Sequence, residues 1–178
     1  MRVLTGRLGG RLLESPRNVR THPMADKVRG ALFNILGDIS ELTVLDAFAG
    51  SGALSFEAIS RGASHVVAVD IDKSAHAIIL KNAHTLHVEA YIKSIRANVN
   101  SWSDNNRTAR FDIVICDPPY DDIKPVLIKK LAQHVKINGI LVLSLPPTLE
   151  FILPTDKFLL RVLKTYGDAM LVFYRRTA

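Results

Sequence analysis

The tetrad Asp117-Pro118-Pro119-Tyr120 combines residue types that could bind and activate a planar amine. It follows the apolar run 111–116, whose β-branched residues predict a short buried strand. Because proline has a fixed φ and no N–H, the loop should leave this strand in one stiff direction. A carboxylate and backbone carbonyls could then accept hydrogen bonds from the amine, while the tyrosine ring stacks beside it. We predict that the tetrad is the reaction centre, at the carboxyl edge of an open α/β sheet.

A second motif, Asp46-Ala47-Phe48-Ala49-Gly50-Ser51-Gly52, joins another apolar segment to a predicted helix. Gly50 and Gly52 would let the backbone pass close to a ligand, which the first N–H groups of the helix would face. The dinucleotide fingerprint requires a third glycine where Ser55 stands, which weakens a nicotinamide or flavin interpretation. The alternative is a turn that only packs the helix on the sheet.

Asp70 ends the next predicted strand, 18 residues after Gly52. An acid in this position can accept two hydrogen bonds from ribose hydroxyls, so with the glycine turn it favours an adenosine-containing ligand. Asn98, after the third predicted strand, could hydrogen-bond an adenine edge through its amide, or could be a turn residue. The candidate cofactor site also includes Ile71, which follows Asp70.

Other catalytic chemistries have little support. His84 and His87 lack an acid or a cysteine at a metal-ligand spacing, so we expect no metal site. The single cysteine, Cys116, is expected to fill core volume; a nucleophilic role stays open because it adjoins the tetrad, although no partner histidine is apparent. The sequence has neither a Gly-x-Ser-x-Gly elbow nor a Walker A loop, which argues against serine hydrolases and P-loop enzymes.

The elements that must position these residues alternate along the chain. Short, β-branched apolar runs predict strands at 42–46, 65–70, 91–96, 111–116, 139–144, 157–163 and 169–174. Apolar residues at helical spacing predict helices at 25–36, 54–61, 73–84 and 123–135. Repeated βα units predict a mostly parallel sheet with helices on both faces, and the two closing strands predict an antiparallel hairpin at one edge.

The composition predicts one soluble domain. A chain of 178 residues, 48% of them hydrophobic, can form one good core, so we treat residues 1–178 as a single domain. Residues 1–24 form a basic extension, which could make a small hairpin around Gly9-Gly10, and residues 25–178 form the catalytic core. One cysteine, no apolar run of membrane-spanning length and no apolar leader predict a cytoplasmic protein.

Positive charge is concentrated near the N-terminus. The formal net charge is +6, and residues 1–29 contain seven basic and two acidic residues, whereas the remaining chain is nearly neutral. A basic extension on a neutral body favours a polyanionic partner such as nucleic acid; the alternative is a solvated tail that confers solubility. The candidate RNA-binding residues are Arg7, Arg11, Arg17, Arg20, Lys27 and Arg29.

These motifs, in this order, resemble a Rossmann-like class I S-adenosylmethionine-dependent methyltransferase with an amino-methylating Asp-Pro-Pro-Tyr signature. The segments 26–36, 46–54 and 60–63 resemble the RsmD family more specifically, and the similarity reaches Tyr166-Gly167-Asp168. Two places differ from the family pattern: Gly30 stands where an acid commonly follows the arginine, and His22-Pro23-Met24-Ala25 replaces Arg-Pro-Thr-Thr. Both differences concern how the N-terminal region would grip RNA.

The resemblance implies methyl transfer from S-adenosylmethionine to the exocyclic N2 amine of a guanine in 16S ribosomal RNA. The substrate would be this RNA or an assembling small ribosomal subunit, and we expect the enzyme to be a monomer. Residues 48–52 would wrap the methionine part of the cofactor, Asp70 would hold its ribose, and Asn98 would lie beside its adenine. Tyr120 would stack on the flipped-out guanine, whose amine would donate to Asp117 and to the carbonyl of the next residue.

Three other functions stay open. Adenine-N6 methyltransferases share the tetrad, although this short chain carries no added target-recognition domain. Protein-glutamine methyltransferases usually have Asn where Asp117 stands, as the resemblance implies. An RNA-binding scaffold without catalysis is disfavoured by the intact glycine turn and tetrad.

Overall fold

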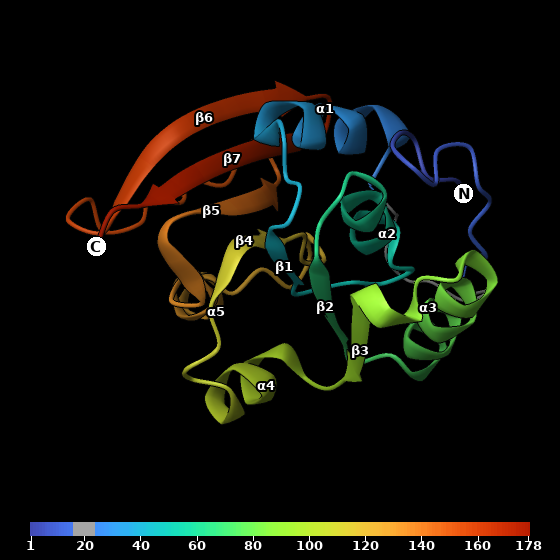
Figure 1. Cartoon of the computed structure of the whole chain (residues 1–178). Coiled ribbons are helices and arrows are strands. Elements are labelled where there is room, and N and C mark those ends of the chain that lie inside the picture. The colour runs from blue at the N-terminus through green and yellow to red at the C-terminus, as the bar shows by residue number, and fades with distance from the viewer. Residues whose placement is uncertain (16–23) are drawn as a thin grey trace.

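Seven strands form one mixed sheet in the computed structural model, which describes residues 1–15 and 24–178 (Figure 1). They are β1 (Thr43–Asp46), β2 (His65–Asp70), β3 (Ile92–Arg96), β4 (Phe111–Cys116), β5 (Val135–Leu145), β6 (Phe158–Tyr166) and β7 (Ala169–Arg176). Their order across the sheet is β3-β2-β1-β4-β5-β7-β6. Strands β1 to β5 are parallel, whereas β7 is antiparallel to both β5 and β6. The predicted parallel sheet with an antiparallel edge hairpin is therefore confirmed.

Helices cover both faces of this sheet, as predicted. The first face packs against α1 (Asp26–Leu36), α2 (Ala53–Ser60) and α3 (Lys73–Leu86), and the second against α4 (Val99–Asn105) and α5 (Pro125–Ala132). A short 3₁₀ helix, η1 (Glu89–Tyr91), precedes β3. Strand β4 contributes to both cores, because its side chains alternate: Ile113 and Ile115 join the first cluster, Val114 and Cys116 the second.

Helix α4 lies where the sequence predicts no element. Its seven residues are mostly polar, so no apolar periodicity marks it. Asn98 caps its N-terminus by accepting hydrogen bonds from the backbone N–H groups of Asn100 (2.9 Å) and Ser101 (3.3 Å), and the buried Trp102 anchors it in the second core. Tertiary packing therefore stabilises this helix.

The boundaries of α5 and β5 also differ from the prediction. Helix α5 starts at Pro125, whose fixed φ suits the first helical turn, and it ends at Ala132 rather than at residue 135. Strand β5 begins at Val135 rather than at residue 139, because Val135 already pairs with Phe111 of β4. Cross-strand pairing, which local periodicity does not report, sets this boundary.

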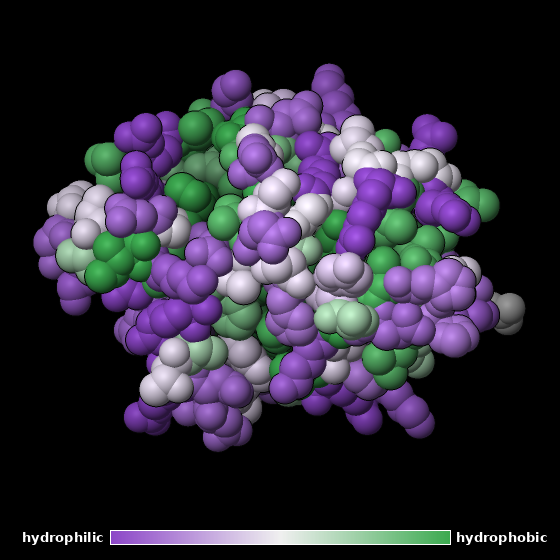
Figure 2. All heavy atoms as spheres, in the orientation of Figure 1, coloured by the Kyte–Doolittle hydropathy of each residue, from purple (hydrophilic) through white to green (hydrophobic). Residues whose placement is uncertain are grey.

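Strand β6 forms the outer edge of the sheet. Three of its leucines, Leu159, Leu160 and Leu163, are exposed, and Figure 2 shows hydrophobic surface on this side of the molecule. Arg161 and Lys164 are interspersed with them, and the pairing with β7 has an irregularity between Leu160 and Val162. Lysine, arginine and a bulge on an edge strand oppose pairing with a second, equally charged strand.

The predicted N-terminal hairpin exists, but it is docked on the body of the protein. A β-bridge joins Arg2 to Leu12, and the N–H of Val3 donates to the carbonyl of Arg11 (3.0 Å). The turn passes so close to the end of α2 that a Cβ on Gly6, which has a φ of +82°, would lie 2.0 Å from the carbonyl oxygen of Ser60. Residues 1–13 are thus a fixed part of the fold.

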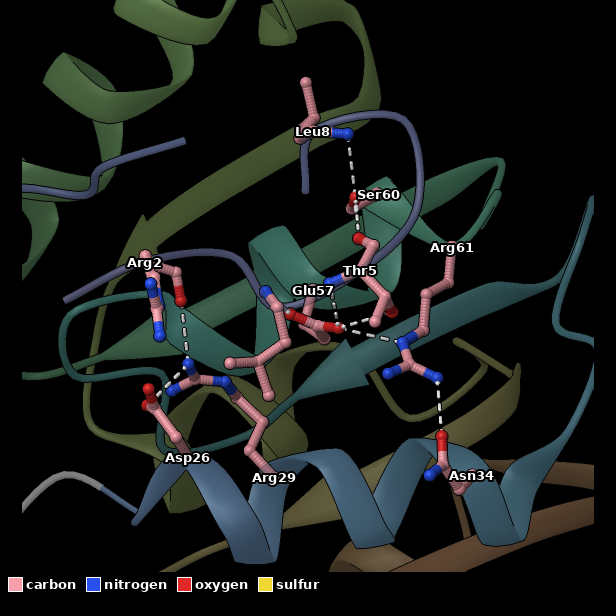
Figure 3. Close-up of polar contacts among 10 residues, drawn as sticks. Arg2, Thr5, Leu8, Asp26, Arg29, Asn34, Glu57, Ser60 and Arg61 are labelled. Carbon is pink, nitrogen blue, oxygen red and sulfur yellow. Dashed lines mark hydrogen bonds and ion pairs between the residues drawn. The ribbon is translucent and has the colours of Figure 1, made fainter. Parts of the chain in front are cut away.

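Glu57 on α2 holds this hairpin (Figure 3). Its buried carboxylate accepts hydrogen bonds from the backbone N–H of Leu4 (2.7 Å) and from both the N–H and the hydroxyl of Thr5, and it pairs with Arg61 (2.8 Å). A buried charge needs several such partners, and here the hairpin backbone supplies them. Residues 1–15 of the basic extension are therefore not a solvated tail, which was the alternative interpretation.

Because Glu57 accepts all of these bonds, Glu57→Gln should lower the free energy of unfolding by about 1.5–3 kcal/mol. The substitution removes the charge and turns one acceptor into an N–H donor that faces other donors. Urea unfolding of the variant measures the loss. The control is Glu150→Gln, at an exposed position, which should change stability by less than ~0.5 kcal/mol. Equal effects of the two substitutions would contradict the role given to Glu57.

Candidate active site

The strand order reverses between β1 and β4. From β1 the chain proceeds to β2 and β3 on one side, and from β4 to β5 on the other. Adjacent crossovers that run in opposite directions leave a crevice at the carboxyl ends of the two strands, where open α/β sheets bind ligands. The glycine turn follows β1 and the tetrad follows β4, so the structure brings the two predicted motifs together at this point.

Three carboxylates converge on this edge: Asp46 ends β1, Asp70 ends β2, and Asp117 follows β4. Burial is the main reason why the pKa of Asp46 is raised to about 7; the hydrogen bond from the Ser55 hydroxyl (2.7 Å) opposes the shift, and the charges of Asp117 and Asp70 add to it. The second carboxylate oxygen of Asp46, Oδ1, is buried without a hydrogen-bond partner among the described residues. The site is therefore built to receive positive charge or hydrogen-bond donors.

The two glycines of the turn have different roles. A Cβ on Gly52, the N-cap of α2, would lie 2.9 Å from Phe56 Cε2 and 3.0 Å from Ile79 Cγ1, so this glycine leaves room for the start of α2 to pack against α3. Gly50 has a φ of +50°, and a Cβ there would meet nothing within 4 Å. The structure thus gives Gly52 a packing role and leaves room beside the backbone at Gly50.

Asp70 contacts the glycine turn, and Ile71 follows it in the chain. Asp70 accepts hydrogen bonds from the backbone N–H groups of Gly50 (2.8 Å) and Asp72 (2.8 Å), so it orients the glycine turn. Each carboxylate oxygen can accept a further bond, as the predicted ribose contact requires. Ile71 is 63% exposed, which leaves an apolar surface beside Asp70.

Asn98 is a helix cap, as the turn interpretation expected. Its Oδ1 atom accepts the bonds at the start of α4, so only its amide N–H groups could meet an adenine nitrogen. In the glycine turn, Phe48 and Ser51 are half-buried and Ala49 is buried; the Ser51 hydroxyl contacts the sulfur of Met1 at 3.7 Å. The N-terminal hairpin therefore reaches the turn itself.

The tetrad forms a loop with one buried and one exposed end. Pro118 is buried, Pro119 is half-buried and its carbonyl accepts from the N–H of Asp122 (3.0 Å), and Tyr120 is 40% exposed. Burial raises the pKa of Asp117 to about 6, and the nearby Ser144 hydroxyl opposes this shift. Asp117 is thus mostly ionised at neutral pH, next to an accessible aromatic ring.

Ser144 is a site residue that the sequence interpretation missed. Its hydroxyl lies 2.9 Å from the Tyr120 hydroxyl, and burial raises the pKa of Tyr120, with the Ser144 contact opposing. The signal in the sequence that could have identified Ser144 is that it is one hydroxyl residue near the carboxyl end of an otherwise apolar strand. Only the pairing of β4 with β5, in which Cys116 lies beside Leu143, puts Ser144 next to Asp117.

Cys116 faces the core. It is fully buried, and burial, followed by the charges of Asp46 and Asp117, raises the pKa of its thiol. The thiolate is the nucleophilic form of cysteine, and this site disfavours it. The core-filling role is therefore the one that the structure supports.

Arg29 requires a correction among the candidate RNA-binding residues. It is 1% exposed, and its guanidinium donates to the carbonyl of Arg2 (2.8 Å) and to Asp26 (2.9 Å), so it ties α1 to the hairpin rather than facing a polyanion (Figure 3). Lys27, Arg7 and Arg11 are exposed. The guanidinium of Arg7 lies over the ring of Tyr91, 4.2 Å from its centroid. Arg17 and Arg20 lie outside the described residues.

The described part of the chain offers neither a metal site nor a membrane span. No group of three or more His, Cys, Asp or Glu side chains in residues 1–15 and 24–178 is arranged to hold a metal ion. No helix within the same ranges is long and apolar enough to cross a membrane.

Solved structures share this architecture. The Escherichia coli protein yhhF superposes with a TM-score of 0.89 over 100% of this chain and 98% of its own, at 27% identity. A protein solved in complex with SAH has the same fold, with a TM-score of 0.70 and 19% identity over 84% of this chain and 48% of its own. The open space at Gly50 and the neighbouring Asp70 carboxylate, which can accept further hydrogen bonds, fit an adenosine-containing ligand. These features place the chain in the class of S-adenosylmethionine-dependent methyltransferases.

The sequence comparisons define the family. The family model "Conserved hypothetical protein 95" matches residues 1–175, and the chain belongs to this family, the RsmD family. Among its relatives is the Escherichia coli K12 protein "Ribosomal RNA small subunit methyltransferase D", 35% identical over 140 residues that cover 78% of this chain and 68% of that protein. The family resemblance of the motifs is thereby confirmed.

Proposed function

We propose that this methyltransferase transfers the methyl group of S-adenosylmethionine to the exocyclic N2 amine of a guanine in 16S ribosomal RNA. The observation that carries the proposal is the placement of the Asp117 carboxylate and the exposed ring of Tyr120 in one loop after β4, at the same edge of the sheet as Gly50. Relatives named as small-subunit ribosomal RNA methyltransferases support the choice of RNA. An assembling small subunit and free RNA are both compatible with the chain.

The cofactor-binding half of the site is built from the glycine turn and its neighbours. The backbone at Gly50 would lie against the methionine part, Asp70 would accept from the ribose hydroxyls, and Ile71 and the amide of Asn98 would contact the adenine. S-adenosylmethionine supplies an electrophilic methyl group on a positively charged sulfur. Burial raises the pKa of both Asp46 and Asp117, and a positive charge nearby would stabilise their ionised forms.

The substrate half is the tetrad. A guanine amine is a weak nucleophile because its lone pair is delocalised into the ring. Hydrogen bonds from its N–H groups to Asp117 and to the carbonyl of Pro118 would raise the electron density on nitrogen, and Asp117 would then stabilise the positive charge that develops. A stacked base cannot reach such a pocket, so the guanine must be flipped out or single-stranded, with Tyr120 as its new stacking partner.

The basic hairpin would bind the RNA backbone through Arg7 and Arg11. Deleting the hairpin is a poor test, because Glu57 would lose its partners. We expect the double variant Arg7→Ala/Arg11→Ala to weaken RNA binding and to lower the slope of log K against log salt by about 0.7–0.9 for each phosphate that is no longer neutralised. Lys129→Ala, on α5 at the opposite face of the sheet, is the control. If the double variant and the control have the same slope of log K against log salt, the hairpin does not contact the RNA backbone.

Methyl transfer from labelled S-adenosylmethionine tests the proposed reaction. The substrates are 16S ribosomal RNA and 30S particles that lack the modification, and the product is digested to nucleosides for mass analysis. We expect N2-methylguanosine. N6-methyladenosine would support methyl transfer to an exocyclic amine but would contradict guanine as the target base. Absence of transfer with the cofactor still bound would reject the RNA substrate.

A further inference from the structure

The outer edge strand of the sheet, β6, carries unpaired positive charge. Lys157 precedes this strand, Arg161 and Lys164 lie within it, and all three side chains are exposed. No acidic residue occurs between Asp156 and Asp168, which flank the strand. Within residues 1–15 and 24–178, no ion pair occupies any of the three basic side chains. Their charge is therefore free to meet an external anion.

The basic residues of the neighbouring strand, β7, bind groups of the protein itself. Arg175 donates to the side-chain oxygen of Asn138 (3.3 Å). Arg176 donates to the backbone carbonyls of Gln133 (3.0 Å) and Val135 (2.7 Å). The charges of β7 thus hold nearby segments together, whereas those of β6 face the solvent.

The register of the sheet places Lys164 in one row with the substrate half of the site. Ser144 on β5 pairs with Leu171 on β7, and Leu171 pairs with Lys164 on β6. Residues paired across antiparallel strands point to the same face, so Lys164 and Ser144 share a face of the sheet. The Ser144 hydroxyl lies 2.9 Å from the hydroxyl of Tyr120. Because neighbouring strands are about 4.8 Å apart, the backbone of Lys164 is about 10 Å from that of Ser144.

The other two cations lead away from the catalytic edge. Strands β5 and β6 are both antiparallel to β7, so Lys164, near the end of β6, lies toward the carboxyl edge of the sheet, and Arg161 and Lys157 lie farther from it. At about 3.3 Å per residue, Arg161 is about 10 Å from Lys164 along the strand. Arg161 has no partner on β7, because the irregularity between Leu160 and Val162 falls there, and such a bulge re-aims a side chain. The three cations form a track along the outermost strand (Figure 1).

We propose that β6 binds the backbone of the RNA strand that continues from the target nucleotide. Lys164 contacts the phosphate nearest to the base that stacks on Tyr120, and Arg161 and Lys157 contact phosphates farther along. Contacts of this kind fix the position of a nucleic acid without reading its sequence. The inference rests on the proposed function for its partner, RNA, but it does not depend on which base is methylated.

The two basic segments of the protein would hold the RNA from opposite sides of the site. The N-terminal hairpin contacts α2 through Glu57 and α3 through Asn82, and these helices pack on the half of the sheet that contains β1, β2 and β3. Strand β6 is the outer edge of the other half. A base that leaves its stack requires its neighbours to stay in place, and contacts on both sides would hold them.

RNA affinity as a function of salt tests the contact with β6. Lys164→Gln should lower the slope of log K against log salt by about 0.7, the value for one phosphate of a single strand. The double variant Arg161→Gln/Lys164→Gln should lower it by about 1.4, and Lys164→Arg should keep the wild-type slope. The control is Lys129→Gln, an equal loss of charge at an exposed position of α5, on the opposite face of the sheet. Affinity for S-adenosylmethionine, measured on the same preparations, verifies that each variant is folded.

Two outcomes would overturn the inference. One is a salt slope of the double variant equal to that of the Lys129→Gln control. The other is a wild-type protein that sediments as a dimer and becomes monomeric on Leu163→Asp, because a second copy would then cover β6 through its exposed leucines.

The nucleosides formed in the labelled-cofactor assay test the proposed function separately. A product other than N2-methylguanosine, together with the predicted slopes, would reject the proposed base and support the contact with β6. N2-methylguanosine, together with slopes equal to that of the control, would reject the contact with β6 alone.

Discussion

Asp117→Ala is expected to reduce kcat for methyl transfer by about 10²–10³-fold, the loss typical of removing one preorganised electrostatic contact at a reacting group. The variant has neither the acceptor for the amine nor the charge that balances the developing cation. Affinity for S-adenosylmethionine should change far less, because the glycine turn, Asp70 and Ile71 remain in place. Single-turnover kinetics and equilibrium dialysis measure the two quantities separately.

The same substitution should not destabilise the protein at alkaline pH. The pKa of Asp117 in the folded state, about 6, lies above its ordinary value of 3.8, so its ionisation favours the unfolded state as pH rises through this interval. Asp117→Ala removes that term, and its unfolding free energy at pH 8 should match or exceed that of the wild type. Near-normal turnover by a folded Asp117→Ala protein would contradict the catalytic role. The activity of the wild type should depend on pH in the opposite direction from its stability. The rate of methyl transfer should fall as the pH drops below about 6 and Asp117 becomes protonated.

Gly50→Val should lower the affinity for S-adenosylmethionine by at least about tenfold while the protein stays folded. A valine here has to adopt a φ of +50°, which is strained for a β-branched residue, and its side chain would enter the space left for the ligand. The free energy of unfolding should fall by ~1–3 kcal/mol from this strain. Cofactor binding by calorimetry, with urea unfolding in parallel, gives both values.

Gly52→Val is the matched comparison for the glycine turn. Its side chain would overlap Phe56 and Ile79, so the main loss should be in folding stability rather than in intrinsic affinity. The two variants thus separate the ligand role from the packing role of one short motif. If Gly50→Val binds the cofactor as well as the wild type, the open space at Gly50 is not the cofactor site.

Local patterns in the sequence determined much of the fold. The run at 65–70 and the run at 111–116 are strands with the predicted bounds, because short β-branched segments between turn residues have few other stable conformations. The positions of Gly50 and of the two prolines followed from backbone stereochemistry, which depends only on the residue itself. Neighbouring motifs at the carboxyl ends of parallel strands then had to meet at one edge of the sheet.

Only the tertiary structure decided which side chains are partners. Ser144 became a site residue through the register of β5 against β4, Arg29 became a buried link to the hairpin, and Glu57 became its anchor. Helix α4 depends on Trp102 entering the core. These contacts join residues far apart in the chain, and residue type does not specify them: an arginine is equally suited to a phosphate and to a backbone carbonyl, and packing determines which of the two it can reach.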